Sequence, residues 1–535
     1  MIKLFHIRIY LLSFLILFLS GILVPIGGHS RSDPISNIQC ITRLDPSGFQ
    51  KCSEEANVSL DPNRDFQKQI SRSFRNKTIL SQNIEFWDVG DQRNFWVYDF
   101  TDLNYYTINA TVLAIGDFCY VFMEENCITE LGEIDASELS IIIRNEFDNK
   151  IYPRVTDLAG HPNGTLGDID GDPRIVILLS DNEMSYYSQN NEQSSEYSNE
   201  CEMIYIYSLL HNWPFYLFTT IAHEFHHLIW FNNEMDEAHF VLEGIADYTS
   251  YHSGYLDPYN NITNRAIQFL SHSEDSLLYF NVYNEEGQNR AIDYGNSYLF
   301  AFYIAEHYGV DILRNLVKEQ RDGAIGIESC LQKAGFNITF NELYFNWITA
   351  LTIDKLGFEN NLYGFKNLDA RMKNFDLITD FPALPKTLSL RFYGFHIQKF
   401  QVLPKNFAIQ IKKAASQTIG TSVIIHNENG WEIYKKLHDK PENIITDYYP
   451  ADSIDEAYII TSYMLNDTPT DSIDFGVGPL IEIEISIFEA TPTSSSSSET
   501  RSTTNLTSGF TNIFTFMFFL GILVCSRHLK NRSCM

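Results

Sequence analysis

The ten residues from Ile221 to Trp230 constrain the fold and function of this chain more than any other stretch. They read IAHEFHHLIW. They include three histidines and one glutamate among apolar residues, and apolar residues on all sides are typical of a buried helix. On a helix His223 and His227 are four residues apart, so their imidazoles project from one face and can bind a single metal ion. Glu224 lies beside them, able to reach a metal-bound water. The stretch is therefore an HExxH motif.

A hydrolytic zinc site needs three protein ligands and an open position for water, so a third carboxylate or imidazole must follow the motif. The segment VLEGIADY supplies Glu243 in a helical pattern. Asp247 follows four residues later on the same face, where it can accept the remaining N–H of a ligand histidine. Glu237 and His239 are competing third ligands, whereas His226 breaks the four-residue spacing and is not expected to be one. The alternative is a helix whose histidines are satisfied by neighbouring side chains.

The net charge of the chain limits the classes of partner that it is expected to bind. The 535 residues include 68 acidic and 38 basic ones, a formal net charge of −30. Phosphate binding needs clustered Lys and Arg, and no basic stripe is present, so we expect no nucleic-acid partner. The acidity favours solubility at a cell surface or in a salty medium over a specific cationic substrate.

The residues at both ends of the chain have patterns typical of segments that enter a membrane. Residues 1–30 combine early basic residues, an apolar run and small residues before a cut, which is typical of a signal peptide; an uncleaved anchor is the alternative. Residues 509–526 are mostly apolar and precede the basic residues 527–535, which predicts a transmembrane helix and a cytoplasmic tail. The Ser/Thr-rich residues 491–508 predict a stalk. We therefore expect a single-pass membrane protein whose bulk lies outside the cell.

The remaining residues predict an α+β protein of more than one folded unit, because 535 residues exceed one ordinary core. Helical periodicity occurs around Ala136 to Phe147 and dominates from Phe215 to Tyr344, and the apolar run Ile175 to Leu179 suits a central strand. Aromatic and β-branched residues near the start and alternating patterns near the end predict strands. The expected organisation is a polar leader (31–79), a β-rich N-terminal subdomain (80–130), a catalytic domain (131–380) and a β-sandwich (381–490).

The cysteines are compatible with an oxidising compartment. The external region holds an even number of them, enough for up to three disulfides among 15 complete pairings, and the local pairings that we expect are Cys40 with Cys52 and Cys119 with Cys127. The six external cysteines are Cys40, Cys52, Cys119, Cys127, Cys201 and Cys330. Sequons for N-glycosylation occur at Asn76, Asn109, Asn163 and Asn337.

A second cluster of carboxylates precedes the predicted central strand. Asp168, Asp170 and Asp172 in DIDGD have the first three spacings of a calcium loop. The glycine is misplaced, however, and Leu179 stands where the bidentate glutamate should be. A turn solvated by its carboxylates is therefore favoured, with a bound calcium ion (Ca2+) as the alternative.

HExxH followed by a separate glutamate resembles the gluzincin metallopeptidases, and the wider sequence resembles the hyicolysin-like peptidases over roughly residues 80 to 380. The matching segments are FDNKIYPRV (147–155), GDIDGDPRIVILLSD (167–181), SNECEMIYI (198–206), TTIAHEFHHLIWFNN (219–233), VLEGIADY (241–248) and YGNSYLFAFYIAEHYG (294–309). The resemblance implies a zincin-like domain with one zinc ion (Zn2+) on His223, His227 and Glu243, and Glu224 as general base. Leu242 departs from the family, which usually has an Asn there, so a contact with the substrate backbone is expected to be missing.

Resemblance to gluzincin aminopeptidases, which place a tyrosine ahead of a glycine-containing helix start, indicates Tyr294 as a donor to the developing oxyanion. Tyr298 is the alternative, and packing is the alternative role for Tyr294. Together these features predict a surface-anchored zinc endopeptidase acting on protein or peptide substrates. The competing hypothesis is a non-catalytic surface binding or adhesion protein built on a peptidase-like scaffold.

Overall fold

The computed structural model describes residues 86–489, apart from 101, 163–168, 235, 256–262, 281–289, 403–405, 451–453 and 470–477. The chain divides into two compact units, Met1–Glu489 and Ala490–Met535, and all described residues belong to the first. The predicted signal peptide, leader, stalk, transmembrane helix and tail lie outside the described residues. Within residues 86–489 as described, no helix is both long and apolar enough to cross a bilayer.

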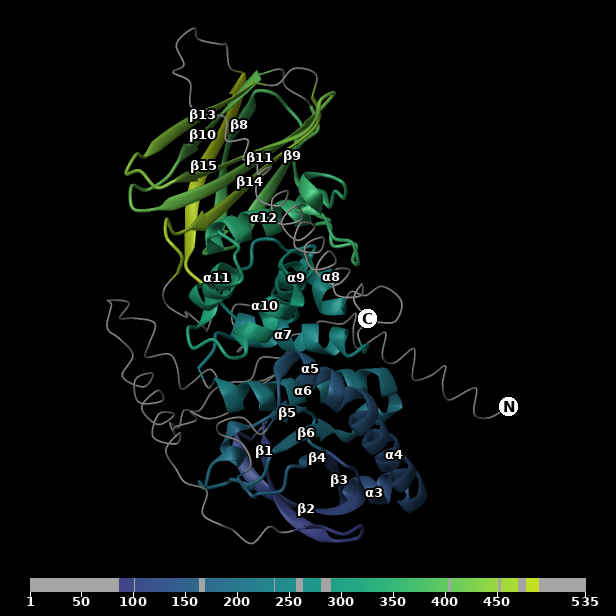
Figure 1. Cartoon of the computed structure of the whole chain (residues 1–535). Helices are drawn as coiled ribbons and strands as arrows, with labels where there is room; N and C mark the ends of the chain where they lie inside the picture. Colours follow the sequence, from purple (N-terminus) through teal and green to yellow (C-terminus); the bar gives the residue numbers. More distant parts are fainter. Residues whose placement is uncertain are drawn as a thin grey trace, which may run out of the picture. The chain divides into compact units, whose positions relative to one another are not determined.

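A six-stranded mixed sheet forms the first layer of the N-terminal half, in the order β1-β2-β3-β4-β6-β5 (Figure 1). Its strands are β1 (Gln92–Asp99), β2 (Asn104–Ile115), β3 (Cys119–Glu124), β4 (Ile175–Ser180), β5 (Tyr186–Tyr187) and β6 (Met203–Tyr207). Strands β3, β4 and β6 pair in parallel, and every β4 residue is buried. The apolar run IVILLS is thus a central strand covered on both faces, as its sequence predicts.

The expected separate β-rich subdomain is not a separate sheet. Strand β3 pairs in parallel with β4, which joins the strands before residue 130 to those after it. The physical reason is that β3 has two buried faces: Val121 points into the core beneath the helices, and Phe122 into the core on the opposite face. The sequence pattern identifies these strands, but the pairing of residues 56 positions apart, such as Cys119 and Ile175, leaves no local signal.

Helices cover one face of this sheet and then form a layer of their own (Figure 1). They are α3 (Glu125–Leu131), α4 (Glu133–Glu146), α5 (Tyr152–Ala159), α6 (Pro214–Asn233), α7 (His239–His252), α8 (Asn264–Phe269), α9 (Arg290–Tyr308), α10 (Val310–Leu316), α11 (Gly323–Lys333) and α12 (Phe340–Ile353). A π-helical turn η2 (Phe147–Ile151) joins α4 to α5, and single 3-10 turns are η3 (Gln189–Glu192), η4 (Ser208–Asn212) and η6 (Glu359–Asn361).

The C-terminal strands form two sheets that share one core. The orders are β13-β10-β15-β8 and β12-β11-β14-β9-β7. The strands are β7 (Asp376–Ile378), β8 (Ala383–Arg391), β9 (Phe395–Phe400), β10 (Asn406–Lys412), β11 (Thr418–Asn427), β12 (Gly430–His438), β13 (Ile444–Pro450), β14 (Ile454–Met464) and β15 (Leu480–Glu489). Alternate residues such as Ile409, Ile485 and Val423 fill the core between the sheets, as the alternating sequence predicts.

The predicted pairing of Cys119 with Cys127 is wrong. Both are free, buried thiols, as are Cys201 and Cys330. Cys119 opens β3 and Cys127 lies in the helix after it, so an extended strand of about 17 Å separates them. That exceeds the reach of a disulfide. Cys40 and Cys52 lie outside the described residues.

Candidate metal centre

The candidate site lies where α6 and α7 pack together. Helix α6 is buried from Ile221 to Asn232, so its histidines are largely shielded from bulk water and need partners inside the protein. Helix α7 supplies them, and it in turn packs closely on α9. Gly244 makes that packing tight, because a Cβ at this position would lie 2.5 Å from the carbonyl oxygen of Ser297. A larger residue beside Glu243 would therefore force α7 away from α9.

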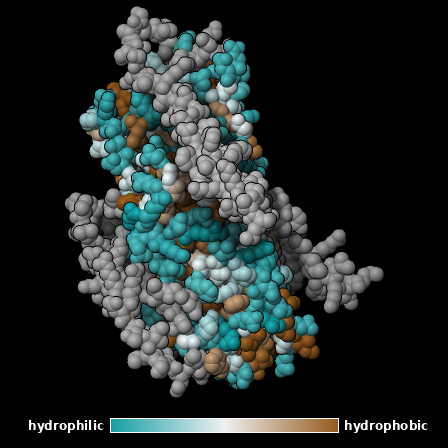
Figure 2. Space-filling model, viewed as in Figure 1, coloured by the Kyte–Doolittle hydropathy of each residue, from teal (hydrophilic) through white to brown (hydrophobic). Residues whose placement is uncertain are grey.

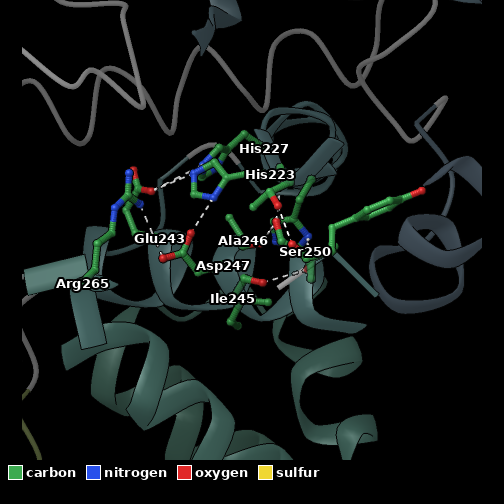
Figure 3. A network of polar contacts seen from close by, with 12 residues as sticks. His223, His227, Glu243, Ile245, Ala246, Asp247, Ser250 and Arg265 are labelled. Carbon is green, nitrogen blue, oxygen red and sulfur yellow. Dashed lines mark hydrogen bonds and ion pairs between the residues drawn. The ribbon is translucent and has the colours of Figure 1, made fainter. Parts of the chain in front are cut away.

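Three side-chain atoms converge at the centre. The Nε2 atoms of His223 and His227 are 3.0 Å apart, and Glu243 Oε2 lies 3.2 Å from the first and 3.6 Å from the second. Figure 3 shows the two imidazoles turned toward this carboxylate. Ligand atoms around a tetrahedral ion with bonds of 2.0–2.1 Å are separated by about 3.3 Å. The spacing of this trio therefore fits a single metal ion, and it is the one such group among the residues that the structure describes.

Asp247 orients the first of these imidazoles. Its Oδ1 lies 2.9 Å from Nδ1 of His223, which directs the other ring nitrogen toward Glu243. The second oxygen, Oδ2, lies 3.5 Å from the guanidinium of Arg265 on α8. Arg265 was not predicted from the sequence, because an isolated arginine at the start of a short helix carries no motif. The structure places it as the outer partner of Asp247.

Electrostatics at His223 favour a cation. Burial would lower the pKa of this imidazole, but hydrogen bonds and charge interactions with Asp247 and Glu243 raise it to about 10. Burial would likewise raise the pKa of Glu243, yet His227 and His223 hold it well below its ordinary value. Two buried carboxylates thus stabilise one positive charge beside Nε2 of His223. A proton can supply that charge, and a metal ion can replace it.

Glu224 lies next to the trio but is not part of it. It is 6% exposed, and its Oε2 is buried without a hydrogen-bond partner among the described residues. Burial raises the pKa of this carboxyl to about 8, the charge of His223 opposes the shift, and the charge of Glu243 adds to it. A buried carboxyl with one oxygen left for another molecule can exchange a proton with it.

The competing residues from the sequence are engaged elsewhere. Oε1 of Glu237 accepts hydrogen bonds of 2.6 Å from the backbone N–H groups of Ala238 and Gly323, so it holds the starts of α7 and α11 together. His239 lies 6.1 Å from the ring of Phe280 and is not in the trio. Nδ1 of His226 pairs with Thr249 at 2.9 Å, which gives this histidine a structural partner.

Tyr294 is connected to the site through Arg265. The guanidinium of Arg265 lies over the Tyr294 ring at 4.0 Å, and the ring is 4% exposed. Tyr298 is fully buried on the same helix, where burial raises the pKa of its phenol well above the ordinary value. Arg265 thus lies between the Tyr294 ring and the Asp247 carboxylate. Tyr298 packs against Phe302, and the charge of Asp247 also contributes to its raised pKa.

The aspartates considered for calcium are not assembled into a cation site by the described residues. Asp168 lies outside them. Asp172 is buried and is committed to Arg174, 3.1 Å away, and to the hydroxyl of Tyr120 at 2.6 Å. Oδ1 of Asp170 accepts the backbone N–H of Asp172 at 2.9 Å. This is the hydrogen bonding of a carboxylate-stabilised turn.

Comparison with known proteins assigns no family. No family model matches the chain, and no curated protein matches it significantly. Among solved structures, Legionella pneumophila aminopeptidase A in complex with aspartic acid is 8% identical at a TM-score of 0.26, and the match covers 69% of this chain and 36% of that one. A family GH115 4-O-methyl-α-glucuronidase is 6% identical at a TM-score of 0.14, with 38% and 30% covered. The chain spans about a third of the aminopeptidase, and likeness at these scores carries no argument.

Proposed function

We propose that this chain is a zinc-dependent peptidase. The observation that carries the proposal is the convergence of His223, His227 and Glu243, with Asp247 behind one imidazole, inside two buried helices. Packing alone does not require this trio and Asp247, because apolar side chains of the same volume could fill the space without two buried carboxylates.

Zinc is the ion that we propose, for two reasons. Two imidazoles and one carboxylate form the donor set of known hydrolytic zinc sites, whereas magnesium and calcium prefer oxygen ligands alone. Three protein ligands also leave a fourth position open, which distinguishes a catalytic site from a structural one. Burial lowers the pKa of His227 and keeps its imidazole in the neutral form that binds metal.

Each residue of the site then has its own role in the proposed peptide hydrolysis. A bound zinc ion would polarise the substrate carbonyl and acidify a water molecule. Glu224 takes the proton of the attacking water and passes it to the leaving amine, so peptide hydrolysis proceeds without a covalent intermediate. Asp247 keeps the His223 ring in place through Nδ1. Tyr294 is proposed to donate a hydrogen bond to the developing oxyanion.

The proposal includes a location at the cell surface, and the sequence is its only support. The signal peptide and transmembrane helix expected at the two ends would leave residues 86–489 outside the cell, anchored by the C-terminal helix. Substrates would then be extracellular proteins or peptides. Protease added to intact cells is expected to release a large soluble fragment, and complete protection of the chain would contradict this orientation.

The substitution Glu224→Gln tests the function, because it keeps the size of the side chain and removes the basic carboxylate. Zinc content should stay near one per chain, while peptide cleavage falls by at least about a hundredfold, the lower range for loss of a general base. Metal analysis and a peptide-library cleavage assay on both proteins measure the two effects. A binding scaffold predicts no cleavage by either protein, and equal cleavage by both would rule out Glu224 as the base.

A further inference from the structure

The two outermost strands of the six-stranded sheet are joined by side chains. Strands β1 and β5 stand at opposite ends of the strand order, yet the sheet curls until β1 returns toward β5 (Figure 1). The backbone N–H of Tyr98 on β1 donates to the hydroxyl of Tyr186 on β5 at 3.1 Å. Nδ2 of Asn182 donates to the carbonyl of the same Tyr98 at 2.6 Å. The segment 182–186 therefore bonds both backbone polar groups of Tyr98.

This connection lies inside the protein. Tyr98, Tyr186 and Tyr187 are each 1% exposed. Hydrophobic residues on the surface gather elsewhere, at the lower right of Figure 2, where Figure 1 has α3 and α4. The Tyr186 ring stacks on the Tyr205 ring of β6, with their centroids 4.1 Å apart. A buried hydroxyl needs a hydrogen-bond partner, and Tyr186 finds one in the β1 backbone.

Strand β5 also contacts the proposed general base. The backbone of Tyr187 donates a hydrogen bond to the Glu224 carboxylate. Because Oε2 of Glu224 has no partner among the described residues, this bond falls on the other oxygen, Oε1. The Tyr187 ring lies 5.8 Å from the ring of Phe231, seven residues further along α6 and on the same side of the helix. The backbone and the side chain of Tyr187 thus both contact α6.

Strand β5 has few backbone contacts that could fix its position. It is two residues long, and β6 is its one partner among the described strands. Successive side chains of a strand point to opposite faces, so Tyr186 enters the core on the β1 side and Tyr187 the core beneath the helices. A short edge strand with few ladder bonds depends on such side-chain contacts for its order.

We propose that Tyr186 and Asn182 are positioning residues for Glu224. They bind β5 to the edge of β1, so that the Tyr187 N–H fixes one oxygen of the Glu224 carboxylate and leaves the other available to a water molecule. This inference rests on the proposed function, because it concerns the general base of that reaction. A general base must lie within hydrogen-bond reach of the proton that it takes. Release of β5 from β1 should therefore slow turnover without removing a metal ligand.

The substitution Tyr186→Phe tests this positioning, because it keeps the ring and removes only the hydroxyl. In the full-length protein in detergent, we expect kcat for peptide cleavage to fall roughly tenfold, with KM within about twofold and zinc near one per chain. Hydrogen exchange of the Tyr187 amide should rise by roughly the same factor, and this readout needs neither metal nor substrate. Asn182→Ala, a second variant that keeps Tyr186, should give the same pattern.

The matched control is Tyr205→Phe. The Tyr205 hydroxyl also donates to the β1 backbone, at the carbonyl of Trp96, 3.0 Å away. Tyr205 lies on β6, however, which pairs with β4 as well as β5 and does not hold Glu224. This variant should lose stability but keep the kcat and the Tyr187 exchange of wild type. Exchange in β3 and β4 reports that the fold of each variant is intact.

The outcomes separate this inference from the proposed function. Unchanged kcat or unchanged Tyr187 exchange in Tyr186→Phe, beside an active wild type, would overturn the positioning role and leave the function in place. An equal fall of kcat in Tyr205→Phe would also overturn it, by assigning the effect to lost stability. A wild type that cleaves no peptide would contradict the function itself, whereas raised Tyr187 exchange in Tyr186→Phe would still support the link from β1 to β5.

Discussion

Substitution of Glu243 and of Glu237 by glutamine tests most directly which glutamate binds the metal. Glu243→Gln removes a proposed ligand charge, so we expect metal affinity to fall by at least about a hundredfold, the upper range for loss of an outer-sphere partner. Glu237→Gln should keep the metal and instead reduce stability by about 1 kcal/mol, because a neutral amide oxygen accepts the N–H groups at the starts of the two helices more weakly than a carboxylate does. Chelator competition and thermal unfolding separate the two effects. Comparable metal loss in both variants would contradict the assignment of Glu243.

Asp247 allows a test of orientation without removal of a ligand. Asp247→Ala deletes the group that holds Nδ1 of His223, and we expect metal affinity to fall about 10- to 100-fold. Thr249→Ala is the matched control two residues along α7, since Thr249 bonds His226 and not a member of the trio. Titration with a zinc indicator measures both proteins. An unchanged affinity in the Asp247 variant would assign its carboxylate to packing with Arg265 alone.

The residues of the centre were largely predictable because their spacing is local. His223 with His227, and Glu243 with Asp247, are four apart on two helices, and that periodicity is readable in the sequence. Arg265 was not predictable, since only the packing of α8 on α9 brings it to Asp247. The sequence also left Glu237 and Glu243 as competing ligands. In the structure Glu237 lies before α7 and accepts backbone N–H groups at the starts of α7 and α11, whereas Glu243 lies within α7 and faces the two imidazoles.

At the scale of helices, Gly244 tests how close packing positions the trio. Alanine normally favours a helix over glycine by about 1 kcal/mol. Here its Cβ would lie 2.5 Å from the Ser297 carbonyl oxygen, so α7 would have to move away from α9. We expect Gly244→Ala to destabilise the fold by about 1–3 kcal/mol and to weaken metal binding, because Glu243 moves with the backbone. Denaturant unfolding and zinc titration measure the two effects.

Gly326→Ala is a control for that helix test. A Cβ at Gly326 would lie 2.1 Å from the carbonyl oxygen of Arg321, so stability should also fall. Helix α11 holds no proposed ligand, however, and metal affinity should stay unchanged. Equal weakening of metal binding in both variants would mean that lost stability, and not the position of α7, controls the centre.

Some helices and strands were predicted from the sequence more accurately than others, and the differences have physical reasons. The helix expected at Ala136 to Phe147 is α4, Glu133–Glu146, but it continues through a π-helical turn that a period of 3.6 residues does not reveal. The strand expected at Ile175 to Leu179 is confirmed as β4. The N-terminal strands were predicted from their composition. Their place in the same sheet as β4 was not, because parallel strands are not joined by a short turn that the sequence could reveal.

At the scale of the described molecule, the helical half and the C-terminal strands share one hydrophobic core. Trp347 of α12 packs with Phe395 of β9, their rings 6.2 Å apart, and Ile424 and Tyr458 of the strands belong to the same cluster. Tyr344 and Ser462 add a hydrogen bond of 3.3 Å across the junction. The sequence predicted both halves but not this junction, because the pairs that form it lie 48 (Trp347 and Phe395) to 118 (Tyr344 and Ser462) positions apart in the sequence. A shared core of this extent should unfold cooperatively.

A lysine at this junction makes stability depend on pH. Lys435 of β12 donates to Asn346 of α12 and to the Tyr363 hydroxyl at 3.0 Å, with its ammonium 4.6 Å from the Tyr363 ring. Burial lowers the pKa of Lys435 from 10.5 to about 7, against the opposing charges of Glu342 and Glu359. Below pH 7 both the folded and unfolded chains carry the proton, so the full penalty for the buried charge is present. Between pH 7 and 10.5 only the unfolded chain keeps the proton, and the contribution of Lys435 to stability rises with pH.

Lys435→Met keeps the apolar stem and removes the titration, so the variant should gain stability relative to wild type at pH 7 and lose about half of that advantage by pH 9. The relevant quantity is the difference in unfolding free energy between the two proteins at each pH, which cancels every other titrating group. Lys436→Met is the matched control, since Lys436 on the same strand is exposed and paired with Asp447. A difference between wild type and Lys435→Met that stays constant from pH 7 to 9, or that Lys436→Met reproduces, would show that the junction does not hold a lysine with a depressed pKa.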